Sequence, residues 1–254
     1  MQLAALHTMY RRRLLMHRSI VQNVIWAFFV TIFVFLGLFH GLIAWGAGGV
    51  HLAEEAPIRI LAFGDSLTAG YGLDDPAKAF PAQLEAHLEG KGFAVEVLQG
   101  GVSGDTTTGG RSGVEWSLAE KPDAVIVALG GNDALRAVDP AITADNINFI
   151  VRRLQKDEIP VLIAGMLAPP NLGRDYGVRF NAIFTDVAEK SGAILYPFFL
   201  DGVVADPSLN QDDRIHPTAE GVAVIVSRIS SSVEELIMRV KERRLNNQSK
   251  SHDE

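Results

Sequence analysis

The chain contains 254 residues, of which 48% are hydrophobic and 21% are charged, and it carries a formal net charge of −7. This length accommodates one domain of about 200 residues with an appendage. The negative charge excludes a global basic field that would recruit nucleic acid, so we expect no nucleic-acid partner. Cysteine is absent, which excludes disulfides, thiolate metal sites and a cysteine nucleophile.

The amino terminus combines a basic region with a long apolar run. Residues 1–23 include consecutive arginines, whereas residues 24–47 are almost entirely apolar. An apolar helix of about 24 residues spans roughly 36 Å, which is enough to cross a membrane. We therefore expect an N-terminal hydrophobic helix that anchors the chain, with residues 1–23 in the cytoplasm. A cleaved signal segment is the alternative, and either interpretation predicts export of the chain after Gly48.

After a short linker, residues 48–57, predicted strands and helices alternate. Apolar runs bounded by turn residues predict strands at residues 58–63, 93–98, 124–129, 161–164 and 193–195. Apolar residues at helical spacing predict helices that begin near residues 75, 140, 175 and 217, with a less regular helix before residue 120. Residues 242–254 are expected to form a polar tail, which is frayed from residue 246 onward.

This alternation indicates one α/β domain, residues 58–241, with a parallel five-stranded sheet between two layers of helices. The expected arrangement is a three-layer α/β/α fold of flavodoxin-like topology. Ligands bind such sheets at the carboxyl ends of the strands. Turns that contain glycine follow three of the strands, at residues 64–66, 104–105 and 130–133, and we expect them to meet in one cleft.

Ser66 follows the first predicted strand directly and is a candidate nucleophile, although serine at this position also suits a helix N-cap. A serine nucleophile needs a base to take its proton, and histidine titrates in the right range. His216 immediately precedes Pro217 and the last predicted helix, which favours it as the base. His87 lies among charged residues of a predicted helix and is expected on the solvated surface.

The base needs a carboxylate to orient it, and the sequence offers Asp212 and Asp213 just before the histidine. Spacing alone leaves both candidates open. The oxyanion of a tetrahedral intermediate needs hydrogen-bond donors, for which the backbone N–H groups of Ser66 and Gly104 and the side-chain amide of Asn132 are suitably placed. The aspartates of the three turns are expected to be turn and cap residues rather than catalysts: Asp65, Asp105 and Asp133.

Four short blocks, in order, resemble the SGNH/GDSL hydrolase superfamily: Gly64–Leu67, Gly104, Gly130–Asp133 and Asp213–His216. The stretches 128–136 and 211–217 are similar to bacterial arylesterases and to periplasmic acyl-CoA thioesterases and lysophospholipases. This resemblance covers about residues 58–240. It implies that Ser66 is the nucleophile, His216 the base and Asp213, rather than Asp212, the orienting acid. It also implies an oxyanion hole formed by Ser66, Gly104 and Asn132.

The resemblance further implies a serine hydrolase that needs no metal or cofactor and cleaves carboxylic esters with short to medium, small or lipid-like acyl groups. We expect the protein to be a monomer. We also expect the loop from Leu167 to Tyr176 to form the wall of the substrate site that contacts the acyl group. Alternatives are an acyl-thioesterase or lysophospholipase, a carbohydrate O-acetyl esterase, or a tethered binding module. The apolar segment 24–47 is longer than the cleaved signal that the resemblance suggests. We therefore expect an inner-membrane anchor facing the periplasm, or a periplasmic protein after cleavage.

Overall fold

The computed structural model describes residues 56–252 of the chain. The expected N-terminal hydrophobic helix, residues 24–47, and the basic residues 1–23 lie outside the described residues. Within residues 56–252, no helix combines the length and the apolar character needed to cross a bilayer. The fold that follows is therefore that of the expected hydrolase domain.

A five-stranded parallel sheet in the order β2-β1-β3-β4-β5 forms the centre of this domain. Its strands are β1 (Ile58–Gly64), β2 (Val95–Gly101), β3 (Ala124–Ala128), β4 (Val161–Ala164) and β5 (Ile194–Tyr196). The last residue of β1, Gly64, lies opposite Gly101 of β2 and Ala128 of β3. Because these three strands end side by side, the residues that follow them meet at one edge of the sheet.

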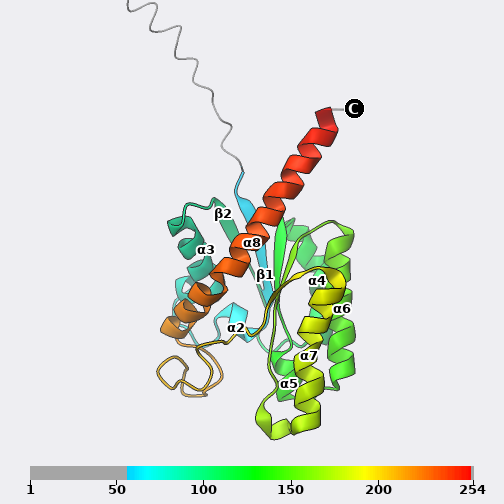
Figure 1. The fold of residues 1–254 in the computed structure, drawn as a ribbon. Helices are drawn as coiled ribbons and strands as arrows, with labels where there is room; N and C mark the ends of the chain where they lie inside the picture. The colour runs from blue at the N-terminus through cyan, green and yellow to red at the C-terminus, as the bar shows by residue number, and fades with distance from the viewer. Residues whose placement is uncertain (1–55, 253–254) are drawn as a thin grey trace, which may run out of the picture. The chain divides into compact units, whose positions relative to one another are not determined.

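Helices cover both faces of the sheet, as Figure 1 shows. On one face α3 (Phe80–Gly90) packs against α8 (Ala219–His252), and on the other α6 (Pro140–Lys156) packs between α4 (Thr107–Ser117) and α7 (Arg174–Ser191). The short helices α2 (Ser66–Ala69) and α5 (Gly131–Leu135) follow β1 and β3 at the carboxyl edge. Single turns of 3-10 helix complete the order: η1 (Pro76–Lys78), η2 (Leu118–Glu120) and η3 (Pro170–Leu172). The expected three-layer arrangement is confirmed.

The hydrophobic core lies between the sheet and its two helical layers. Every residue of β3 is buried, as expected for a central strand covered on both faces. Helix α6 buries Ile147, Ile150 and Leu154, which lie three and four residues apart and therefore on one face. Burial of each such side chain stabilises the fold by about 1.5–3 kcal/mol, so the core fixes the positions at which the strands end.

Two segments expected to be turns belong to regular elements. Strand β2 begins at Val95 and runs to Gly101 rather than ending at residue 98, because Gly100 and Gly101 extend its ladder with β1. Residues Gly131–Leu135 form helix α5, which begins after Gly130 at φ +116. Glycine adopts this backbone conformation without strain.

The expected frayed tail is wrong for the residues that the structure describes, since α8 continues to His252. Residues 241–245 of this helix, Lys-Glu-Arg-Arg-Leu, are good helix formers, and no glycine or proline follows them. Arg243 donates to the Glu158 carbonyl at 2.8 Å, and Arg244 donates to the Ala56 carbonyl at 2.8 Å. These contacts attach the extended helix to the amino edge of the sheet.

Candidate active site

A chain of hydrogen bonds joins Ser66, His216 and Asp213 at the carboxyl edge of the sheet. The Nε2 atom of His216 lies 2.9 Å from Ser66 Oγ, and its Nδ1 atom lies 2.6 Å from Asp213 Oδ2. Ser66 is the first residue of α2, directly after β1, while His216 lies in the loop before α8. With Nδ1–H donated to the carboxylate, Nε2 is the ring atom able to accept the serine proton.

Backbone hydrogen bonds hold the Asp213 carboxylate against the histidine. Its Oδ1 atom accepts the N–H groups of Ile215 at 2.9 Å and His216 at 3.0 Å. These bonds, led by the one from the His216 N–H, lower the pKa of Asp213 to about 2, so the side chain is ionised at neutral pH. Both aspartates left open by spacing are exposed, and it is Asp213 that contacts the ring.

Asp65 and Asn132 form a second polar contact between the turns that follow β1 and β3. Asp65 is only 1% exposed. Its Oδ1 atom accepts the Leu67 N–H at 3.0 Å and caps α2, as expected, while Oδ2 accepts the Nδ2–H of Asn132 at 3.2 Å. Burial raises the pKa of Asp65 to about 6, although both hydrogen bonds oppose the shift.

Gly104 lies in the loop between β2 and α4 with φ +83, a conformation that favours glycine. Its carbonyl accepts a hydrogen bond from Arg136 at 2.9 Å. The start of α4 is held by the buried Asp133, which accepts the Thr107 N–H at 2.8 Å and the hydroxyl groups of Thr107 and Thr143. Asp133 therefore ties this loop to α5, which agrees with the structural role expected for it.

An apolar cavity of about 470 Å³ opens beside Asn132. Of the expected acyl-side loop, residues 167–170 line it, whereas Tyr176 lies in α7 and donates to the Val138 carbonyl at 2.9 Å. Sequence reasoning missed a second wall, formed by residues of the irregular stretch after β5: Phe198, Leu200 and Val204. That stretch has no helical or strand periodicity, so its apolar residues gave no signal of where they would lie.

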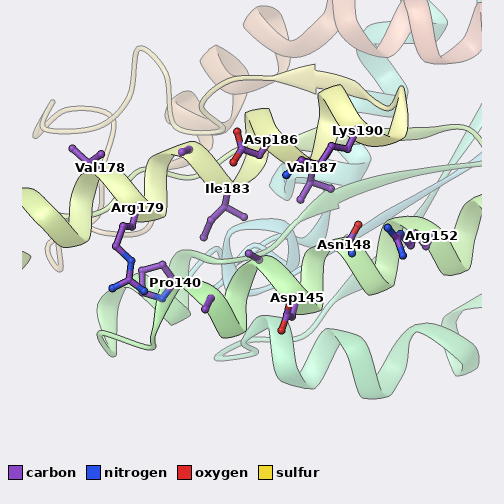
Figure 2. Close-up of a pocket in the computed structure, with 13 residues that line it drawn as sticks. Pro140, Asp145, Asn148, Arg152, Val178, Arg179, Ile183, Asp186, Val187 and Lys190 are labelled. Atoms are coloured by element: carbon purple, nitrogen blue, oxygen red, sulfur yellow. The ribbon is translucent and has the colours of Figure 1, made fainter.

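A second groove, of about 600 Å³, lies between α6 and α7 (Figure 2). Its lining includes Asp145 and Arg152 from α6 and Asp186 and Lys190 from α7. The chain neighbours of Ser66 and His216 do not line this groove, whereas Asp65, Leu67 and Ile215 line the apolar cavity. Charges of both signs also suit a hydrated surface. The apolar cavity beside Asn132 is therefore the candidate site for an acyl group.

Two further contacts involve the rings of His216 and His87. The ring of Tyr71 lies 4.6 Å from that of His216, with an interplanar angle of 42°, a contact that sequence reasoning missed. His87, expected on the solvated surface, is half-buried: its Nε2 atom lies 3.1 Å from the hydroxyl of Ser230 in α8, which is 3% exposed. His87 thus belongs to a helix contact and not to the cleft.

A serine hydroxyl bonded to a histidine, beside an apolar cavity at the carboxyl edge of a parallel sheet, is the arrangement of a carboxylic ester hydrolase. A model of the GDSL-like lipase/acylhydrolase family matches residues 62–224, and the chain belongs to this family. The family expected from the four sequence blocks is confirmed.

The relatives of this chain carry the names of hydrolases. It is 36% identical to esterase TesA of Pseudomonas aeruginosa over 170 residues, which are 66% of this chain and 84% of that protein. It is 32% identical to thioesterase 1/protease 1/lysophospholipase L1 of Escherichia coli strain K12 over 179 residues, 70% of this chain and 84% of that protein. Among solved structures, the SGNH-hydrolase family esterase AlinE4 is similar with a TM-score of 0.60 and 46% identity, covering 70% of this chain and 96% of that chain.

Proposed function

We propose that the protein cleaves carboxylic esters of short to medium acyl chains through an acyl-enzyme formed on Ser66. The observation that carries this proposal is the hydrogen-bonded chain from Ser66 Oγ through the His216 ring to Asp213, with distances of 2.9 and 2.6 Å, next to an apolar cavity. Asp213 is the orienting acid of the triad, because its carboxylate favours the histidine tautomer that can accept the serine proton.

In this mechanism, Ser66 Oγ attacks the ester carbonyl carbon while His216 Nε2 takes the serine proton. The tetrahedral oxyanion accepts hydrogen bonds from the N–H groups of Ser66 and Gly104 and from the Asn132 amide. His216 then gives the proton to the departing alcohol as the C–O bond breaks, which leaves the acyl group on Ser66. Water, deprotonated by His216, attacks the acyl-enzyme and releases the carboxylic acid.

The substitution Ser66→Ala tests the mechanism. We expect it to abolish hydrolysis of p-nitrophenyl butyrate and labelling by a fluorophosphonate, because no other residue takes the place of the nucleophile. Ser230→Ala is the matched control, since Ser230 also contacts a histidine ring but lies between α3 and α8; it should retain both activities. Undiminished turnover by the Ser66 variant at unchanged fold would refute the proposal.

The apolar cavity also favours a second candidate, an acyl-thioesterase or lysophospholipase. Leu135, Leu167 and Val204 line the cavity and are nevertheless exposed, so an acyl chain can extend from the cavity along an apolar rim. A panel of aryl esters, acyl-CoA thioesters and lysophospholipids of matched chain lengths separates the two functions. Release of acetate from acetylated sugars, with little turnover of longer acyl groups, would instead favour a carbohydrate O-acetyl esterase.

We also propose that the protein acts on the periplasmic side of the inner membrane, with residues 24–47 as the anchor and residues 48–57 as the linker. The support is the apolar run behind a basic amino terminus. Membrane fractionation and sequencing of the mature amino terminus test this. A soluble periplasmic product that begins after about residue 47 would replace the anchor by a cleaved signal segment.

A further inference from the structure

The carboxylate of Asp65 makes a contact that a helix cap does not require. Its Oδ1 atom accepts the Leu67 N–H and so caps α2, a task that a neutral asparagine or serine performs equally well. A carboxylate that is 1% exposed is energetically unfavourable to bury unless it is well hydrogen-bonded. The second oxygen, Oδ2, accepts the Nδ2–H of Asn132 at 3.2 Å, so this contact needs its own explanation.

The local backbone brings these two side chains together. Asp65 and Asn132 follow β1 and β3, which are neighbours in the sheet and end level with each other at Gly64 and Ala128. A Cβ atom at Gly131 would lie 3.4 Å from Asp65 Oδ2, so the first turn of α5 packs directly against the carboxylate. The contact between Asp65 and Asn132 is therefore built into rigid elements of the fold.

A carboxylate selects one orientation of the neighbouring amide. The amide of Asn132 presents Nδ2 as a donor and Oδ1 as an acceptor, and a half-turn about its last torsion exchanges them. An ionised carboxylate only accepts hydrogen bonds, so Asp65 admits the orientation in which Nδ2 faces it. The amide nitrogen has a second hydrogen, and Asn132 also lines the cavity. The reversed amide would instead turn an oxygen toward a developing negative charge.

We propose that Asp65 is a positioning residue, whose carboxylate holds the Asn132 amide with an N–H directed to the oxyanion. The inference rests on the proposed function, in which Asn132 is an oxyanion donor. Removal of one such donor typically lowers kcat about 10²–10³-fold. Loss of the positioning carboxylate should have a smaller effect, about 10–100-fold, because an unheld amide still visits the productive orientation.

A double-mutant cycle on the full chain tests this coupling, with p-nitrophenyl butyrate as substrate. The variants are Asp65→Asn, Asn132→Ala and the two combined, and circular dichroism checks the fold of each. Asp65→Ser is added as a second variant, since it retains a capping oxygen but is too short to reach the amide. The matched control is Asp75→Asn, which alters an exposed cap aspartate that accepts the Ala77 N–H at 2.9 Å.

We expect Asp65→Asn and Asp65→Ser to lower kcat about 10–100-fold with KM within about threefold, while Asp75→Asn changes neither. When Asn132 is already alanine, the amide that Asp65 orients is absent. The Asp65 substitutions should then lower kcat by a further factor of less than about three. Equal losses in both backgrounds, or no loss in the wild-type background, would overturn the positioning role. An inactive wild type would refute the proposed function itself and is thus a separate outcome.

Discussion

Replacing the buried Asp65 by asparagine should change how the stability of the protein depends on pH. Burial raises the pKa of this carboxyl group from 3.8 to about 6, a difference of about two units. The folded state therefore binds the proton more tightly than the unfolded state, and stability falls as pH rises from 3.8 through 6. At about 1.36 kcal/mol for each unit, the ionised carboxylate destabilises the fold by about 3 kcal/mol above pH 6.

The asparagine variant has no such titration. Its free energy of unfolding, relative to wild type, should therefore increase by about 3 kcal/mol between pH 3.5 and pH 7.5. Urea denaturation followed by circular dichroism at several pH values measures this difference directly. Of the titratable groups around Asp65, His216 lowers its pKa and Asp133 raises it. A difference that is independent of pH, or that moves in favour of wild type as pH rises, would refute the reasoning.

Three further outcomes follow from the site and the core. Asp213→Asn should lower kcat by about 10⁴-fold at unchanged fold, because a neutral partner no longer favours the productive histidine tautomer; stopped assays with p-nitrophenyl butyrate and circular dichroism check this, and a loss under tenfold would contradict it. Leu200→Trp should reduce kcat/KM for octanoate esters while sparing acetate esters, because the larger ring fills part of the cavity; equal losses for both would place the acyl chain elsewhere. Phe180→Ala, at a fully buried position, should lower the free energy of unfolding by about 3–5 kcal/mol in urea titrations. A change below about 1 kcal/mol would contradict this, because it would mean that the core closes the space left by the Phe180 ring.

The fold could be predicted from the sequence because strand ends and helix faces carry local signals. Apolar runs such as 124–128 identify buried strands, and the spacing of Ile147, Ile150 and Leu154 identifies the buried face of a helix. Local signals do not determine where a strand ends, since pairing with β1 extends β2 through two glycines that would otherwise indicate a turn. At the end of α8, helix propensity and contacts with the amino edge of the sheet prevail over polar composition.

Some contacts of the candidate site could also be predicted from the sequence, and others could not. Ser66, His216 and Asp213 follow recognisable turns, so their meeting at the carboxyl edge could be inferred from the order of the elements. The contact between Asp65 and Asn132 could not, because it depends on two strands ending at the same level rather than on any spacing along the chain. The same holds for the cavity wall at residues 198–204, which lies in a segment without periodicity.

Helix α8 has a consequence for biosynthesis. Its 34 residues are the last described element of the chain, yet they pack against α3 and against β3, β4 and β5. While the polypeptide emerges in order from its amino terminus, β3, β4 and β5 lack the cover of this helix on one face of the sheet until it has been made. A stop codon placed before Ala219 should therefore yield aggregated material in inclusion bodies rather than a shorter working enzyme.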